Sequence, residues 1–190
     1  MSDKKHKIIS VAAELIHSKG YEATKIRDIM AAADIGKGQF YHYFSSKKEL
    51  GLAVIEHFVF TWENELIHGI LGSDKSSEKK LKEMLEWAVD YHENLPNMFG
   101  CPFGNLALEM SEHDEEFRKR INNLFHQWIH CLEGVIKELS GEQRALQKAQ
   151  SLVAQIEGGI LLMKNYQDIA ILKEIIESIQ LQYLEKPKGV

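Results

Sequence analysis

Residues that interrupt helices or cross-link chains are scarce in this sequence. Only three prolines and two cysteines, Cys101 and Cys131, occur among its 190 residues. Two cysteines are too few for a disulfide framework, and neither begins a zinc-ligand pattern, so we expect both thiols to be reduced. Because the glycines fall mostly between periodic segments, long helices can form nearly everywhere. The sequence therefore predicts an all-α protein.

Long apolar runs are missing as well. The longest candidate, residues 160–163, ends at Lys164, far short of the roughly 20 residues that span a bilayer. Lysines precede an apolar segment near the N-terminus as they do in a signal peptide, but Glu14 interrupts that segment and no small-residue cleavage site follows. We therefore expect a cytoplasmic protein without a membrane-spanning segment.

Motifs that carry enzyme chemistry are also absent from the sequence. It has no nucleophile motif, phosphate-binding loop or paired metal ligands, so we expect no catalytic residues, no cofactor and no enzymatic activity. His126 and His130 have the i, i+4 spacing of two metal ligands, but they lie away from the apolar stripe through Leu124 and Trp128. With no third ligand at a matching spacing, we expect no metal site.

The charges that are present divide unevenly along the chain. Residues 1–50 carry nine Lys and Arg against six Asp and Glu, a balance of +3, and the remaining 140 residues carry fourteen against twenty-two, a balance of −8. This distribution is expected if only the N-terminal end meets a polyanion. A helical protein-interaction module with an acidic body is the alternative.

Apolar periodicity predicts nine helices. Thr24, Ser46 and Asp114 stand as N-caps, and Ser46 has capping-box spacing with Glu49. Pro102 is suited to the first position of a short helix. The expected helices cover about residues 3–19, 25–33, 37–44, 47–68, 81–93, 102–110, 115–139, 142–164 and 168–184.

The second and third helices have the proportions of a helix-turn-helix, joined by the turn in "DIGKGQFYHYF". A simple corner in a helical protein is the alternative. Gly36 and Gly38 allow close approach to a duplex, while Lys37 can donate to guanine and Gln39 can pair with adenine. The tyrosines and histidine at 41–43 can hold phosphates, and the phenylalanines at 40 and 44 can anchor the helix.

Residues 23–50, "ATKIRDIMAAADIGKGQFYHYFSSKKEL", resemble the DNA-binding signature of the TetR family of bacterial transcriptional regulators. The resemblance implies a nine-helix fold with a helix-turn-helix domain over residues 1–46 and a ligand-binding and dimerisation domain over residues 47–190. It also implies a repressor that binds a palindromic operator as a homodimer and is released by a small-molecule effector.

The resemblance further assigns residues to three sites. Gln39 departs from the smaller Thr or Ser that many members carry at this position, so the operator preference is expected to be distinctive. The implied DNA-binding residues are Thr24, Lys25, Arg27, Lys37, Gly38, Gln39, Tyr41, His42, Tyr43 and Lys47. The implied ligand-binding residues are Phe58, Trp62, Trp87, Tyr91, Cys101, Phe103, Asn105 and Trp128. The implied dimer interface comprises Leu152, Ile156, Gly159, Met163, Ile175 and Ile179, with packing inside one subunit as the alternative.

Cys101 lies in a turn rich in proline and glycine, "FGCPFGN". A thiol near a helix N-terminus can have a lowered pKa and react with electrophiles or oxidants. A buried cysteine with a purely structural role is the alternative reading of the same turn.

Overall fold

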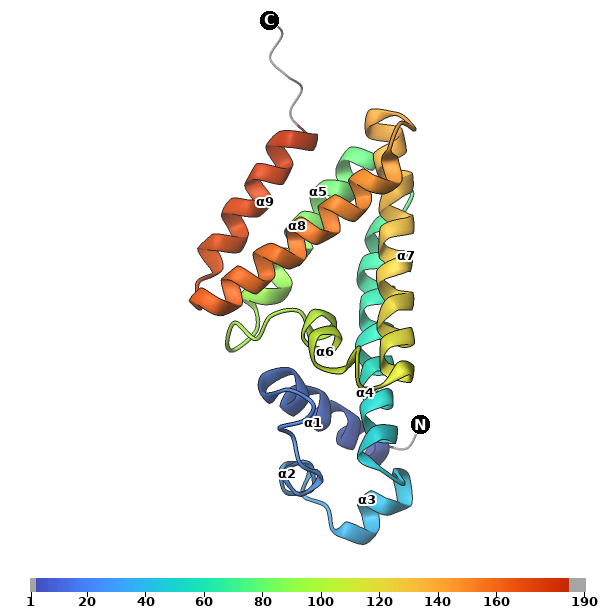
Figure 1. The fold of residues 1–190 in the computed structure, drawn as a ribbon, viewed down its shortest axis with the longest axis vertical. Helices are drawn as coiled ribbons and strands as arrows, with labels where there is room; N and C mark the ends of the chain where they lie inside the picture. The colour runs from blue at the N-terminus through green and yellow to red at the C-terminus, as the bar shows by residue number, and fades with distance from the viewer. Residues whose placement is uncertain (1–2, 185–190) are drawn as a thin grey trace, which may run out of the picture. The chain divides into compact units, whose positions relative to one another are not determined.

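The computed structural model describes residues 3–184, and over this range the chain is helical with irregular connections (Figure 1). It contains nine α-helices and one π-helical segment, which confirms the expected all-α class. They are α1 (Asp3–Lys19), α2 (Ile26–Ala33), α3 (Lys37–Tyr43), α4 (Lys47–Trp62), η1 (Glu63–Leu71), α5 (Ser77–Glu93), α6 (Pro102–Met110), α7 (Glu115–Ser140), α8 (Ala145–Tyr166) and α9 (Ile169–Tyr183). The outer ends of the two expected domains, residues 1–2 and 185–190, lie outside the described residues.

Local capping explains why several helices begin where the sequence predicts. Ser46 Oγ accepts a hydrogen bond from the Glu49 backbone N–H at 3.1 Å, at the start of α4. Asp114 Oδ1 accepts one from the Glu116 N–H at 2.9 Å, at the start of α7. Each side chain satisfies a backbone donor that has no partner inside its own helix.

The N-cap of α2 is Lys25, and the expected cap at Thr24 is wrong. Thr24 is fully buried, and its hydroxyl donates to the Gly20 carbonyl oxygen at 2.7 Å, with the Leu15 carbonyl oxygen 3.3 Å away. The Asp28 carboxylate accepts from the Lys25 N–H at 3.2 Å. Thr24 therefore ties the connection before α2 to the end of α1.

The long helix expected over residues 47–68 changes character at Glu63, where α4 gives way to the π-helical segment η1. A Cβ atom at position 69 would lie 2.7 Å from the Asn64 carbonyl oxygen, so this wider turn requires glycine at that position. Apolar periodicity marks the buried face of such a segment, but it does not distinguish an α-turn from a π-turn.

The described helices pack into two compact units. The first contains residues 3–61 and 102–123, and the second contains residues 62–101 and 124–184. Two of the boundaries between the units fall within α4 and α7, and the third falls directly before α6. This division reflects packing, and the functional boundary expected after residue 46 stays a prediction.

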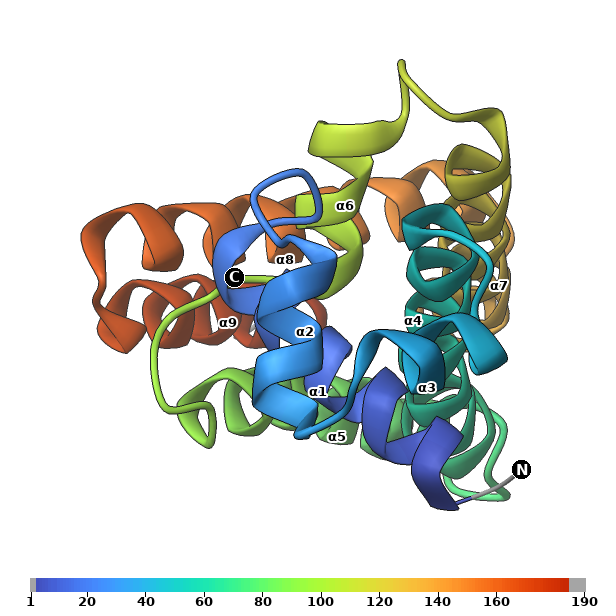
Figure 2. The ribbon, with the colours of Figure 1, turned by 90° about the horizontal axis from the view of Figure 1, so that it is seen from below.

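The first unit holds α2 and α3 at a steep angle to each other, as Figures 1 and 2 show. Phe40 and Phe44 are only 0% and 1% exposed, and their rings contact each other at 6.1 Å between centroids. Burying these two rings fixes α3 by its inner face and leaves its outer surface to solvent.

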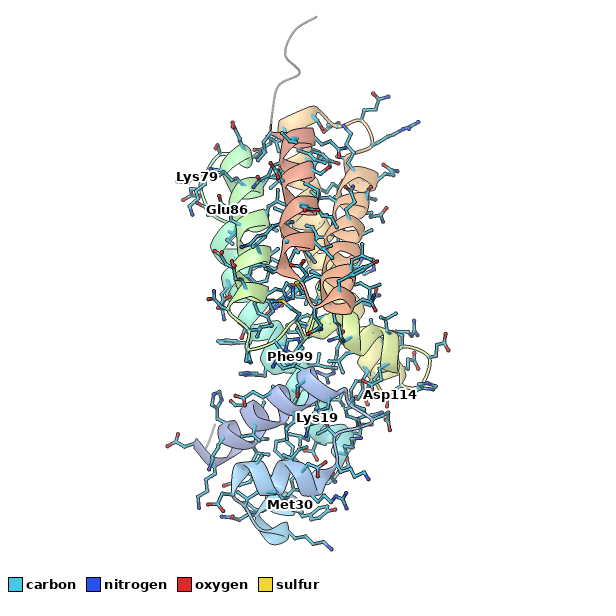
Figure 3. All side chains as sticks on the ribbon, turned by 90° about the vertical axis from the view of Figure 1, so that its left-hand side faces the viewer. Lys19, Met30, Lys79, Glu86, Phe99 and Asp114 are labelled. Atoms are coloured by element: carbon cyan, nitrogen blue, oxygen red, sulfur yellow. The ribbon has the colours of Figure 1, made fainter. Side chains whose placement is uncertain are left out.

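The second unit places α9 against both α8 and α5 (Figures 1 and 3). Gly159 makes the contact between α8 and α9 close, because a Cβ atom there would lie 3.2 Å from side-chain atoms of Leu172 and Ile175. The apolar stripes of these helices thus form the core of one subunit.

Candidate nucleic-acid interface and effector site

The outer surface of α3 carries the residues expected to read DNA. They are exposed and nearly consecutive, interrupted only by the buried Phe40: Lys37, Gly38, Gln39, Tyr41 and His42. No heavy atom lies within 4 Å of a Cβ built at Gly36 or Gly38, so both glycines face open space. A polar and accessible helix surface of this kind suits a DNA groove.

Ring contacts position the donors on this surface. The Lys37 ammonium lies 6.0 Å from the centroid of the Tyr41 ring, and the Tyr41 ring meets the Phe40 ring edge-on at 5.2 Å. His42 and the half-buried Tyr43 are in edge contact at 4.8 Å. The buried phenylalanine thereby orients the exposed tyrosine, and the tyrosine in turn restrains the lysine.

Two of the other expected DNA-binding residues lie on or beside α2. Lys25 and Arg27 are exposed, and the Arg27 side chain is 74% accessible with Nε 3.6 Å from Asp28 Oδ1. An exposed pair of this type contributes little to stability, so the guanidinium is free to exchange a carboxylate for a phosphate. Thr24 is fully buried, so the structure shows a packing role for its side chain, and the expected DNA contact of this residue stays a prediction.

The lysines at the start of α4 are engaged within the first unit. Lys47 is half-buried, with Nζ 4.3 Å from the centroid of the Tyr21 ring and 3.3 Å from the Glu22 carbonyl oxygen. Lys48 Nζ lies 2.8 Å from Asp114 and 3.0 Å from Glu116. The resemblance assigns Lys47 to DNA binding, whereas its neighbour Lys48 is turned toward the start of α7.

These contacts change the titration of the groups involved. Hydrogen bonding to Asp114 and Glu116 raises the pKa of Lys48, and the Lys48 ammonium lowers the pKa of Asp114. Both shifts favour the charged pair that joins α4 to the start of α7; Asp114 is labelled in Figure 3.

Glu109 on α6 is a further residue of the first unit that sequence reasoning missed. Its two carboxylate oxygens accept hydrogen bonds from consecutive backbone N–H groups, from Tyr21 at 2.8 Å and from Glu22 at 2.7 Å. These donors lie in the connection between α1 and α2. Glu109, 88 residues from Tyr21 in sequence, therefore holds the connection between α1 and α2 that leads into the helix-turn-helix.

Five of the expected ligand-binding residues come together in the second unit. The Trp62 ring contacts the rings of Trp87, Tyr91 and Trp128 edge-on, at 5.1, 6.0 and 5.8 Å between centroids. Trp87 Nε1 donates to Glu65 at 3.1 Å. Cys101 is only 2% exposed; burial raises the pKa of Tyr91 to about 12, and the neighbouring Cys101 acts in the same direction.

The remaining expected ligand-binding residues belong to the first unit. The rings of Phe58 and Phe103 are in edge contact at 6.1 Å, and Phe58 also contacts His17 at 5.9 Å. Phe103 is fully buried, whereas Phe58 and Asn105 are half-buried. The expected ligand site thus divides into an aromatic cluster in each unit.

Glu157 on α8 joins the cluster of the second unit. Burial raises the pKa of Glu157 to about 7, and a hydrogen bond with the Cys101 thiol acts in the opposite direction. Glu157 Oε1 is shielded from solvent and has no hydrogen-bond partner among the described residues. Sequence reasoning missed this acid because a single Glu in an apolar helix has no local signal.

The residues expected at the dimer interface lie mostly in the core of the described subunit, and their role in a dimer interface stays a prediction. Leu152, Ile156 and Met163 are 0% exposed and Ile179 is 1% exposed, while Gly159 faces α9. Ile175 is half-buried and lies against Gly159. Periodicity identified the more apolar face of each helix, but that face covers the other helices of the same subunit.

Other surfaces offer less to a ligand. A groove of about 380 Å³ on α5 has mostly charged walls that include Lys79 and Glu86, both labelled in Figure 3. His126 and His130 are exposed on α7, and no group of three or more His, Cys, Asp or Glu side chains among residues 3–184 is arranged to hold a metal ion. None of the described helices is both long and apolar enough to cross a membrane.

Comparisons with known proteins give matches over both ends of the chain. Residues 8–54 match the family model described as bacterial regulatory proteins, tetR family. Residues 78–178 match the model described as transcriptional regulator LmrA/YxaF-like, C-terminal domain.

Individual relatives extend over nearly the whole chain. An uncharacterized HTH-type transcriptional regulator in the lacX 3′ region of Lactococcus lactis subsp. lactis is 39% identical over 185 residues, which cover 96% of this chain and 94% of that protein. The HTH-type transcriptional repressor DhaR of Mycobacterium sp. is 28% identical over 83% of this chain and 80% of its own. The crystal structure of a TetR transcriptional regulator from Legionella pneumophila superposes with a TM-score of 0.82 at 25% identity, over 96% of this chain and 98% of that one.

Proposed function

Because the chain belongs to the tetR family of bacterial regulatory proteins, we propose that it is a repressor that binds a palindromic operator as a homodimer and is released by a small molecule. Proteins of this family are DNA-binding transcriptional regulators and not enzymes. The proposal concerns how this member binds, assembles and responds, and it places the protein in the cytoplasm with its DNA.

The observation that carries the proposal is the two-sided character of α3. Phe40 and Phe44 on its inner side are buried, and its outer surface presents the exposed residues Lys37, Gln39 and Tyr41. Lys37 and Gln39 supply the donors and acceptors that recognise guanine and adenine in the major groove. Tyr41, His42 and the residues of α2 then contact phosphates, which fixes the register of the helix on the duplex.

Dimerisation is supported by the outer faces of α8 and α9. Leu161, Leu162 and Tyr166 on α8 are 54%, 44% and 66% exposed, and Leu181 on α9 is 51% exposed. Gly158 belongs to the same outer side of α8, since no atom lies within 4 Å of a Cβ built there. A second copy of the chain, related by a two-fold axis, can cover these side chains. A two-fold symmetric dimer of this kind would bind a two-fold symmetric operator.

Release by a small molecule requires a connection between ligand and α3. Helix α4 begins at Lys47, just after α3, and ends at Trp62, a member of the aromatic cluster in the second unit. A ligand that prefers one position of Trp62 can bias the position of α4, and operator affinity then falls by the coupling free energy.

The test is binding to a fluorescent random duplex as a function of salt. Affinity should fall steeply with ionic strength, and Lys37→Ala should weaken binding; if the Lys37 ammonium neutralises a phosphate, the variant should also flatten the dependence of log affinity on log salt by about one unit. Tyr41→Phe should weaken binding and leave thermal stability unchanged. Lys19→Ala, an exposed lysine of α1 labelled in Figure 3, is the matched control.

A protein-interaction module without DNA binding is the rival function, and its main support is the acidic balance of residues 51–190. It predicts no salt-dependent retention on duplex DNA and no difference between the Lys37 and Lys19 variants. A large loss of stability in the Lys37 or Tyr41 variant would also contradict the proposal, because it would assign those residues to packing.

A further inference from the structure

Basic side chains gather where α1 begins. Three lysines and a histidine occupy positions 4–7, and Asp3 is the acid of the first turn. Lys4 and Lys7 are exposed, and neither forms an ion pair with another residue in the range 3–184. These two lysines therefore present charge that is not neutralised at the surface of the first unit.

Contacts of the neighbouring residues locate the start of α1 within the first unit. The Lys5 ammonium lies 5.2 Å from the centroid of the Phe44 ring at the end of α3, and it interacts electrostatically with Glu49 at the start of α4. The His6 ring meets the His57 ring, further along α4, edge-on at 5.8 Å. Figure 2 shows the same arrangement, with the start of α1 beside α3 and α4.

The helical rotation then places the two exposed lysines. Successive side chains of an α-helix are about 100° apart, so the step from His6 to Lys5 turns from the middle of α4 to the end of α3. The next step in the same direction brings Lys4 past that end, and Lys7 follows along α1, roughly 60° further round. Both lysines therefore lie on the exposed side of α1 that borders α3.

Helix stability does not account for these lysines. The partial positive charge of the first helical turn makes cations unfavourable there, and like charges three residues apart repel each other. Helix α7, by contrast, begins with Glu115 and Glu116, whose charge has the favourable sign. A sequence that departs from such a local rule is expected at a functional surface.

We propose that Lys4 and Lys7 bind backbone phosphates of the duplex next to the groove that α3 enters. The inference rests on the proposed DNA binding and adds to it a contact surface outside the helix-turn-helix. Charge complementarity selects the partner, since a duplex carries about one negative charge per 1.7 Å of its axis. The start of α4 supplies less of the complementary charge, because Lys48 is paired with Asp114 and Glu116. Phosphate contacts of this kind position the protein on the duplex without reading its sequence.

The experiment compares the double variant Lys4→Ala/Lys7→Ala with the wild-type protein on a fluorescent random duplex over a series of salt concentrations. The loss of two phosphate contacts should flatten the dependence of log affinity on log salt by about 1.8 units for each subunit that contacts the duplex. The matched control is Lys79→Ala/Lys82→Ala, which removes two exposed lysines with the same spacing from α5 in the second unit. The control changes the net charge equally and should leave the slope unchanged.

Stability and a charge-retaining variant separate a phosphate contact from a packing role. Lys4→Ala/Lys7→Ala should not lower the Tm, because it removes unfavourable charges from the start of a helix. Lys4→Arg/Lys7→Arg keeps both charges and should retain the wild-type slope. A lowered Tm in the alanine variant, or lost binding in the arginine variant, overturns the inference in favour of packing.

The same titrations separate this inference from the proposed function. Salt-dependent binding with equal slopes for the wild-type protein and Lys4→Ala/Lys7→Ala overturns the inference and leaves the proposed DNA binding intact. An equal loss of slope in the α5 control overturns it as well, because net charge alone would then explain the effect. If the wild-type protein does not bind the duplex, the proposed function and the inference fail together.

Discussion

Replacing Glu109 tests whether α6 holds the connection between α1 and α2. In the wild-type protein each carboxylate oxygen of Glu109 accepts one backbone hydrogen bond, from the Tyr21 N–H at 2.8 Å and the Glu22 N–H at 2.7 Å. Hydrogen bonds to a charged group contribute about 1.5–3 kcal/mol each, and less where water can replace the partner. The Tyr21 bond is partly buried and the Glu22 bond is exposed.

The expected loss follows from these two environments. We assign about 2 kcal/mol to the partly buried bond and about 1 kcal/mol to the exposed one, so Glu109→Ala should cost about 3 kcal/mol locally. Glu109→Gln retains one acceptor oxygen and should cost about half as much. The Tyr21 ring stays anchored against Phe117 at 4.9 Å and under Lys47, so the first unit should remain folded.

Hydrogen exchange at the Tyr21 and Glu22 amides is the direct assay. A loss of about 3 kcal/mol corresponds to roughly 100-fold faster exchange through local opening. Glu112→Ala, which removes an exposed acid three residues further along, should leave both amides unchanged. Exchange rates in Glu109→Ala within about threefold of wild type would refute the reasoning, because the two bonds would then contribute almost nothing.

Three further predictions concern the second unit. Gly158 faces open space, so Gly158→Leu should obstruct a partner subunit and give monomers in light scattering. Gly159 packs against α9, so Gly159→Val should stay dimeric and lose roughly 1–3 kcal/mol of unfolding free energy. The reverse result would reassign the dimer face. In urea titrations, the unfolding free energy of the wild-type protein relative to Glu157→Gln should fall by up to about 3 kcal/mol between pH 4.5 and pH 7. The reason is that an acid with a raised pKa contributes stability at low pH, and this stability is lost as the pH rises through the folded value of about 7. A difference that does not change with pH would contradict this. Cys101, 2% exposed, should react with iodoacetamide at least about tenfold more slowly than in the unfolded chain, and rapid alkylation with loss of DNA binding would instead support electrophile sensing.

Local interactions made much of the fold predictable. The caps at Ser46 and Asp114 act within three residues of the side chain, so sequence spacing alone identifies them. The same holds for α3, where a helical period places the phenylalanines on the inner face and Lys37 and Gln39 on the outer one. In both cases the physical cause lies within one helical turn.

Contacts between distant segments could not be predicted in the same way. Glu109 meets a backbone 88 residues away, and Glu157 meets Cys101 through the fold, so neither leaves a local pattern. Threonine is a common N-cap residue, but the Thr24 hydroxyl donates hydrogen bonds to carbonyl oxygens of the preceding segment instead. On α8, periodicity identified an apolar face at Leu152 without indicating whether it covers the same subunit or a partner.

Selection of bound sequences from a random duplex library tests the central claim most directly. The account predicts enrichment of a two-fold symmetric sequence with two half-sites, since one α3 from each subunit of a dimer enters the major groove. Gln39→Ala should relax the base preference at one position in each half-site and leave the spacing unchanged. Enrichment of no sequence, or of a motif that the Gln39 variant selects unchanged, would contradict the account.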